Sequence, residues 1–238
     1  MLAALLAAHG WTAGCTIIEG RRGYLQAVAA TPRAERILMG LGDHFEIESI
    51  TRKRHASSSL THSAIDLVME LKEEYNLTAP SIEAIDVRTF DVHYLLEGHW
   101  PERRLEGPHS LPYLLAVAFL DGEVLDPQFG PARREDPLVR YLFDRVMVAA
   151  DSELTARVPE ELPARMTITL KDGRKVEGYR PHPKGDPRDP LTEAELLAKF
   201  RRLAGATLET RRLDSIEGWI QDAEVRPSVR DLTELLAA

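Results

Sequence analysis

The sequence predicts an α+β protein in which a central block of strands and helices lies between two helical ends. Alternating apolar and polar residues, together with a hairpin signal, fall in the middle of the chain. Helical patterns dominate residues 1–40 and the residues after 190, and a proline-rich stretch at 182–190 precedes the second helical end. We therefore expect the central block to be inserted between two ends that belong to one helical layer.

The N-terminal end is expected to begin with a buried helix. Residues 1–8 are almost wholly apolar, and Gly10 follows them where a helix would end. A helix that is apolar on every side needs cover on every side, and no neighbouring stretch obviously provides it. Further turns are expected at Gly14, Gly20 and Gly23.

The central block begins where helical spacing gives way to alternation. Phe45–Ile50 alternates apolar and polar residues, which is typical of a half-buried strand. A helix is expected over 57–76 because its apolar residues form one stripe, and 82–90 is typical of a strand. Further on we expect a buried helix at 110–120, a short helix at 137–146, a strand at 146–150, and two strands at 166–170 and 175–180. The last two flank Asp172-Gly173, a pair that supplies the positive φ angles of a tight hairpin.

The C-terminal end follows a stiff loop, since residues 182–190 contain three prolines and a glycine. Thr192 and Glu195 form a capping box, which predicts a helix to about Ala204. Two shorter helices are expected near 214–221 and 228–237.

Composition excludes several classes of function. The formal net charge is −8, which makes a nucleic-acid partner a poor hypothesis. The apolar stretch at 1–10 is too short to span a membrane and lacks the basic start of a signal peptide. The chain has one cysteine, Cys15, which excludes an internal disulfide framework and fits a cytoplasmic location.

The densest polar cluster lies at 52–66 and leads into the expected helix at 57–76. Its cations, a histidine and several hydroxyls at cap positions surround a helix N-terminus, which attracts carboxylate or phosphate groups. His62 stands in the first turn, one turn before Asp66 on the same face, and a histidine there tends to stay neutral, as a general base or hydrogen-bond donor requires. A solvated charge run with ordinary serine caps is the competing interpretation.

The sequence gives little support for a metal site, a cofactor site or a catalytic tyrosine. His55 and His62 are seven positions apart, which fits no ligand pattern on one helix face, and we predict no metal site. The sequence contains no dinucleotide or phosphate-binding glycine loop, so we predict no cofactor. Tyr113 begins an apolar helix, where a core residue with one hydrogen bond is the commoner role.

Several stretches resemble the MmgE/PrpD family. Residues 185–201 resemble its G-D-P-x-N-P-L-x-x-E-E-L-x-x-K-F signature, and 53–66 resembles its K-P-Y-P-C-C-R-H-T-H-A-A-I-D segment. The helix from Ser110 to Gly122 is similar to the family's S-x-x-Y-x-x-A-x-x-x-x-x-G pattern, and 17–24 is similar to its I-L-E-G-x-x-G-F turn.

The departures from the family pattern lie in the polar cluster. The residues after the family lysine are replaced by Arg54, His55 and Ala56, so that His55 stands in place of a tyrosine. The two cysteines become Ser57 and Ser58, and the basic pair becomes Ser59-Leu60. The lysine and the second histidine carry over to Lys53 and His62, whereas the substrate specificity of the loop does not.

The resemblance implies a fold and a division of the chain. It covers only the C-terminal half of the family pattern, in which a lid-type α+β domain is inserted into an all-helical domain. Residues 1–42 would be a helical segment of that domain, 43–185 the lid, and 186–238 helices that return to the helical domain. The cover of the helix at 1–8 would then lie in a separate chain that carries the N-terminal helical half.

The resemblance also implies a function. The family acts on small polycarboxylates without a redox cofactor, and we expect a lyase subunit that dehydrates a 2-methylcitrate-like acid, in a homo- or hetero-oligomer. An epimerase or racemase, a decarboxylase and a non-catalytic truncated partner are the alternatives. His62, Lys53 and Tyr113 would be catalytic. The substrate-binding residues would be Lys53, Arg54, His55, Ser58 and Ser59. The loop at 183–190 would join the lid to the helical domain, and Lys199 and Phe200 would anchor that loop structurally.

Overall fold

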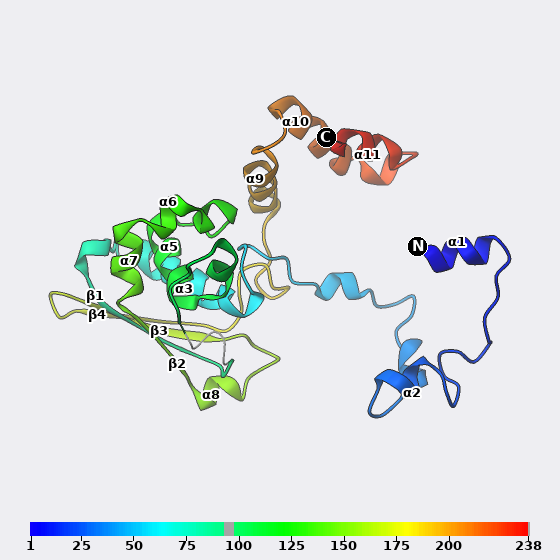
Figure 1. Cartoon of the computed structure of the whole chain (residues 1–238), viewed down its shortest axis with the longest axis horizontal. Helices are drawn as coiled ribbons and strands as arrows, with labels where there is room; N and C mark the ends of the chain where they lie inside the picture. The colour runs from blue at the N-terminus through cyan, green and yellow to red at the C-terminus, as the bar shows by residue number, and fades with distance from the viewer. Residues whose placement is uncertain (93–97, 238) are drawn as a thin grey trace. The chain divides into compact units, whose positions relative to one another are not determined.

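A computed structural model describes residues 1–92 and 98–237 of the chain (Figure 1). The chain divides into two compact units, Met1–Ser49 and Ile50–Ala238. The second unit contains strands and helices in one sheet-based core, so the predicted α+β class is confirmed. The insertion of a lid into an all-helical domain, and the division at 42/43 and 185/186, stay predictions.

The first unit holds short helices and turns. Its elements are α1 (Leu2–Ala8), α2 (Tyr24–Val28), η1 (Ala34–Ile37) and η2 (Glu46–Ser49). Gly10 follows α1 with a φ of +85°, as the sequence predicts for a helix end. The apolar residues of α1 are exposed in this chain, and their cover by a separate helical chain stays a prediction. One expectation is wrong. Phe45–Ile50 is not a strand, because no strand in the described part of the chain pairs with it, and its apolar residues Phe45, Ile47 and Ile50 are exposed.

The second unit is built on a four-stranded sheet with the order β2-β1-β3-β4. Its strands are β1 (Ile82–Thr89), β2 (Val146–Ala150), β3 (Ala164–Leu170) and β4 (Lys175–Arg180). β1 and β2 are parallel, while β3 is antiparallel to both β1 and β4. Gly173, with a φ of +87°, turns the predicted hairpin between β3 and β4. Each of the four strands matches an expected one.

Three helices cover one face of this sheet (Figure 1). They are α3 (His62–Glu74), α5 (Leu111–Asp121) and α7 (Pro137–Phe143), all within expected ranges. α3 packs on β3 and β4, whereas α5 packs between α3 and α7 and reaches β2. Ile65, Ile85 and Leu114 are fully buried between these layers, and such side chains each contribute about 1.5–3 kcal/mol of transfer free energy.

Short helical pieces connect these elements. They are η3 (Ser59–Thr61), η4 (Ala79–Ser81), η5 (Arg104–His109), η6 (Asp126–Phe129), α6 (Pro131–Arg134) and α8 (Ser152–Thr155). Within the described ranges, no helix is long and apolar enough to cross a bilayer.

The C-terminal helices follow the proline-rich loop. They are α9 (Glu193–Ala204), α10 (Thr210–Gln221), the short η7 (Ala223–Val225) and α11 (Arg230–Leu236). The capping box is confirmed, because Thr192 Oγ1 accepts a bond from the Glu195 N–H at 3.2 Å and Glu195 Oε2 accepts one from the Thr192 N–H at 2.8 Å. α9 is tied to the α+β block by an ion pair between Arg202 and Glu123 at 2.8 Å.

Candidate functional site

The centre of the polar cluster is the carboxylate of Asp66, which is fully buried in the first turns of α3. Its Oδ1 accepts hydrogen bonds from Arg54 at 3.1 Å and from His55 Nε2 at 3.0 Å. Its Oδ2 accepts the Lys184 N–H at 2.8 Å and lies 3.7 Å from the Arg180 Nε. A buried carboxylate persists only with such partners. Burial alone would raise the pKa of Asp66, but the hydrogen bond from His55 and the surrounding positive charge lower it.

His55 is held by this carboxylate and is only 2% exposed. Because an ionised carboxylate can only accept, Nε2 is the nitrogen that carries the proton in neutral His55. Burial lowers the pKa of His55, the Asp66 carboxylate opposes this, and the charges of Arg54 and Lys199 add to the lowering. The imidazole is therefore neutral at pH 7.

His62 is the first residue of α3 and is fully buried. Its ring lies edge-on to the His55 ring, with centroids 5.0 Å apart. Burial and then the neighbouring His55 lower the pKa of His62 to about 3, so His62 is neutral because of desolvation more than because of the helix terminus. Neither ring nitrogen has a hydrogen-bond partner in the described part of the chain. The hydrogen bond to Asp66 is made by His55 and not by His62, although His62 lies one turn before Asp66 on the same helix.

The turn between these histidines is held by main-chain oxygens. Lys53 is exposed and its Nζ donates to the Ser57 carbonyl at 3.0 Å. The Thr61 hydroxyl donates to the Ser58 carbonyl at 2.7 Å. Thr61 is the N-cap residue of α3, as expected, but its side chain makes no cap bond, and the 3₁₀ turn η3 leads directly into α3.

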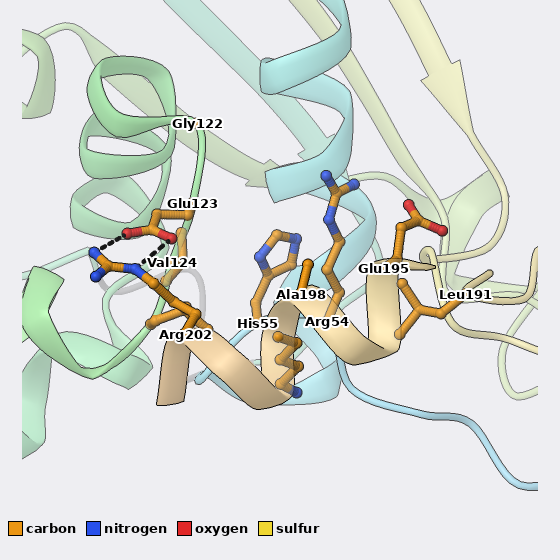
Figure 2. A pocket seen from close by; sticks show the side chains of 11 residues that line it. Arg54, His55, Gly122, Glu123, Val124, Leu191, Glu195, Ala198 and Arg202 are labelled. Carbon is orange, nitrogen blue, oxygen red and sulfur yellow. Dashed lines mark hydrogen bonds and ion pairs between the residues drawn. The ribbon is translucent and has the colours of Figure 1, made fainter. Parts of the chain in front are cut away.

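A pocket of about 350 Å³ opens beside this cluster (Figure 2). One wall is the segment of Arg54 and His55, the second is the loop Gly122–Leu125, and the third is α9. The charged residues among its lining are Arg54, Glu123, Glu195, Lys199 and Arg202. Figure 2 shows the His55 ring between the side chain of Arg54 and the ion pair of Glu123 with Arg202.

The main chain that carries His55 is fixed on three sides. The Arg52 N–H donates to the Gly185 carbonyl and the Ala56 N–H to the Val124 carbonyl, each at 2.8 Å. The Lys199 ammonium on α9 donates to the Lys53 carbonyl. The expected anchoring of the 183–190 loop by Lys199 stays a prediction. The position of His55 in the pocket wall is thus set by contacts from loops distant in sequence.

Most of the predicted site residues lie close together in the structure, whereas Tyr113 lies apart from them. Lys53, Arg54, His55 and His62 adjoin one another, and the partly exposed Ser58 and Ser59 lie in the turn between them. Of the predicted residues, Arg54 and His55 line the pocket.

Tyr113 lies elsewhere. It is fully buried, its hydroxyl donates to the Gln128 carbonyl at 2.6 Å, and it is absent from the lining of the pocket. Burial raises the pKa of Tyr113 to about 12. Its expected hydrogen bond to a reacting group stays a prediction.

Sequence reasoning missed several members of the site. Glu123, Glu195 and Arg202 reach the pocket from loops and a helix whose position no local pattern reveals. Arg180, the last residue of β4, and Lys184, in the loop after it, both contact Asp66. The only signal for this in the sequence is that a predicted strand ends just before a proline-rich loop. Across residues 1–92 and 98–237, no group of three His, Cys, Asp or Glu side chains is arranged to hold a metal ion.

Comparison with known proteins identifies the class. Residues 55–221, which include the histidine cluster, the sheet and α9, match the model of the MmgE/PrpD C-terminal domain. The chain belongs to this family, and the resemblance seen in its sequence is confirmed.

Several curated proteins are similar to this chain over most of its length. The chain is 27% identical to the cis-aconitate decarboxylase-like protein oryM of Aspergillus oryzae, an alignment that covers all of this chain and 52% of that protein. It is 25% identical to a cis-aconitate decarboxylase of Aspergillus terreus, over 86% of this chain and 44% of the relative. It is 26% identical to the human cis-aconitate decarboxylase, an alignment that covers 79% of this chain and 40% of the human protein. The chain thus spans about half the length of the curated relatives it matches.

Proposed function

We propose that this chain supplies the C-terminal domain of a lyase that acts on small polycarboxylic acids without a redox cofactor. The observation that carries the proposal is the pocket wall in which neutral His55 adjoins the cations Arg54, Lys199 and Arg202. Cations hold the carboxylates of such an acid, and a neutral imidazole exchanges a proton with it. The names of the relatives favour decarboxylation of an acid of the cis-aconitate type.

Decarboxylation of such an acid needs only fixed positive charge and a proton donor. The bond between the substrate skeleton and one carboxylate breaks, carbon dioxide leaves, and the electron pair stays on the skeleton until a proton is added. Fixed positive charge stabilises that electron pair as it develops. Lys53 and Arg54 would bind the remaining carboxylates together with Ser58 and Ser59. His62 would orient the reacting group through the His55 ring against which it packs.

Dehydration of a 2-methylcitrate-like acid is the second candidate. It removes a proton from one carbon and hydroxide from the next, which leave together as one water, so it needs the same clamp and the same proton-transfer group. An epimerase or racemase needs the proton transfer alone, and a non-catalytic partner needs neither. Of these candidates, decarboxylation has the additional support of the relatives' names.

We also propose that a second chain carrying a helical half completes the enzyme, in a homo- or hetero-oligomer in the cytoplasm. An apolar groove of about 450 Å³ lies along the C-terminal helices and supports this proposal. The apolar residues that line it are Leu196, Leu197, Phe200, Ile216, Ile220, Leu232 and Leu236. Free Cys15 is exposed, which suits a reducing compartment.

The test is a turnover assay in deuterated water followed by NMR. The full chain is assayed alone and as the complex isolated from its native cells, with cis-aconitate, 2-methylcitrate and related tricarboxylates. Release of carbon dioxide with one deuterium in the product supports the decarboxylase, and loss of water without carbon dioxide identifies the dehydratase. Deuterium exchange with neither loss indicates the epimerase. No change in any acid by the isolated complex contradicts the proposal of an enzyme.

A further inference from the structure

We propose that His55 and Asp66 form a proton-transfer pair at the pocket, in which His55 Nδ1 exchanges the proton with the substrate and Asp66 is the positioning residue. This deepens the proposed function and rests on it for the identity of the substrate.

The geometry fixes which nitrogen does the chemistry. Asp66 Oδ1 and His55 Nε2 are 3.0 Å apart, and the carboxylate is fully buried with its other oxygen held by the Lys184 N–H. The carboxylate therefore cannot turn away, and it accepts the Nε2 proton. The lone pair of neutral His55 is then on Nδ1, so the second ring nitrogen is the one that takes up a proton.

The ring is also pre-positioned. Ala56, the next residue along the chain, is bonded through its N–H to the Val124 carbonyl of the opposite pocket wall. Lys199 holds the Lys53 carbonyl on the other side. A catalytic base held from both sides and oriented by a buried carboxylate meets the geometric requirement for efficient proton transfer.

The charges around His55 favour reversible protonation of Nδ1. The titratable or charged groups that face His55 or share its pocket are Asp66, His62, Arg54, Lys199, Glu123, Glu195 and Arg202. When Nδ1 takes a proton, the Asp66 carboxylate offsets the new charge on the ring. In the lyase reaction, Nδ1 takes up one proton from solvent water in each turnover. It gives that proton to the carbon that keeps the electron pair after carbon dioxide leaves, and the ring returns to its neutral form.

His62 differs from His55 in position. Both rings are neutral and buried, but His55 lines the pocket and His62 does not. His62 packs edge-on behind His55, with centroids 5.0 Å apart. The pocket thus meets one imidazole directly, and that imidazole is the one paired with the carboxylate.

The first experiment needs no substrate. Long-range ¹H–¹⁵N NMR of the full chain labelled at histidine reports the tautomer of each ring, with His55→Gln to assign the signal. We expect the Nε2–H form of His55 at pH 7 in the wild type, and a mixture of tautomers with a further lowered pKa in Asp66→Asn. Asp86→Asn is the matched control, because that carboxylate pairs with exposed Arg88 at 2.8 Å. A wild-type Nδ1–H form, or a tautomer unchanged by Asp66→Asn, overturns the pair.

The second experiment measures catalysis by the isolated complex. We expect His55→Gln and Asp66→Asn each to lower kcat by about 10²–10⁴-fold with little change in KM, and Asp66→Asn to shift the midpoint of the pH–rate profile. Thermal melts separate this loss from unfolding, since His55→Gln leaves Asp66 with Arg54 and Lys184. Turnover that survives His55→Gln overturns the catalytic role of the pair while the proposed function stands. A complex without turnover contradicts the proposed function, whereas the tautomer result still decides the pair.

Discussion

The backbone N–H of Arg52 donates a 2.8 Å hydrogen bond to the carbonyl of Gly185, although 132 positions of sequence separate them. Gly185 has a φ of +97°, and a Cβ atom on it would lie 1.9 Å from the Arg52 carbonyl oxygen. Glycine is therefore required here both by conformation and by space. The contact brings the proline-rich loop against the segment that carries His55, and the adjacent Lys184 N–H reaches Asp66.

The first prediction concerns this glycine. Gly185→Ala should destabilise the chain by about 3 kcal/mol or more, because the loop must move to relieve both the clash and the positive φ. Gly173→Ala is the control, since Gly173 also has positive φ but no atom lies within 4 Å of its added Cβ. That change should cost about 1–2 kcal/mol. Urea unfolding measures both, and equal losses would contradict the close approach at Gly185.

Local patterns predict the fold well where the chain's own periodicity decides it. Residues 82–90 and the hairpin at Asp172-Gly173 became β1, β3 and β4, because alternation and a turn with positive φ act within a few residues. The parallel pairing of β1 with β2 could not be predicted, since it depends on the packing of α5 and α7 between them. Phe45–Ile50 alternates as a strand does, but in the absence of a partner strand among the described residues, Glu46–Ser49 forms the 3₁₀ helix η2.

The candidate site was predictable in part for the same reason. The cluster at 52–66 was visible as adjacent cations, histidines and hydroxyls. A neutral His62 was expected from its place at the helix terminus, but the main cause of its lowered pKa is burial, which the sequence does not reveal. The pairing of Asp66 with His55 could not be predicted. Helical spacing favours His62 as the partner of Asp66, and the path of the segment before the helix cannot be predicted from its sequence. Lys199 and Arg202 joined the pocket only through the packing of α9.

A second prediction tests the place of Tyr113. Tyr113→Phe removes the donor to the Gln128 carbonyl and should destabilise the chain by about 1–3 kcal/mol, because a buried acceptor loses its partner. Thermal or urea unfolding gives this value, with exposed Tyr24→Phe as the control. Turnover by the complex should persist. A large loss of kcat at unchanged stability would instead support the predicted catalytic hydrogen bond.

A third prediction follows from the low pKa of His62. In the folded chain this pKa is about 3, against 6.5 for an unperturbed histidine. Below pH 6.5 the unfolded state binds more protons than the folded state, so stability falls as the pH falls toward 3. The His62 contribution to this loss should be about 2 kcal/mol by pH 5.

Urea unfolding across pH 7 to pH 4.5 measures this dependence. His62→Gln should flatten the slope and leave the part due to His55, whose pKa is also lowered. His44→Gln is the control, because His44 is exposed and its pairing with Glu46 lies at the surface. A slope that His62→Gln leaves unchanged would show that His62 is not the titrating group.

A fourth prediction tests the proposed carboxylate clamp. Lys53→Ala should raise KM for an anionic substrate by about 10–100-fold in the isolated complex, because a charged hydrogen bond to a carboxylate is worth about 1.5–3 kcal/mol. The effect on kcat should be smaller. Lys175→Ala removes an exposed lysine from β4 and should change neither constant. An unchanged KM in Lys53→Ala would remove this residue from the substrate site.

The last prediction concerns the apolar groove of α9, α10 and α11. Ile220 lines it and is 55% exposed, so the isolated chain should self-associate, since exposed apolar surface of this kind favours contact with other molecules. Sedimentation velocity of the isolated chain should show oligomers that Ile220→Glu shifts toward monomer. Leu105→Glu is the control, because Leu105 is 81% exposed but lies outside the groove. A monomeric wild type would contradict the prediction. An equal response to both changes would assign the association to general hydrophobicity and not to the groove. A selective response to Ile220→Glu identifies the groove as the contact surface, and the same variant should then weaken the binding of the proposed helical partner.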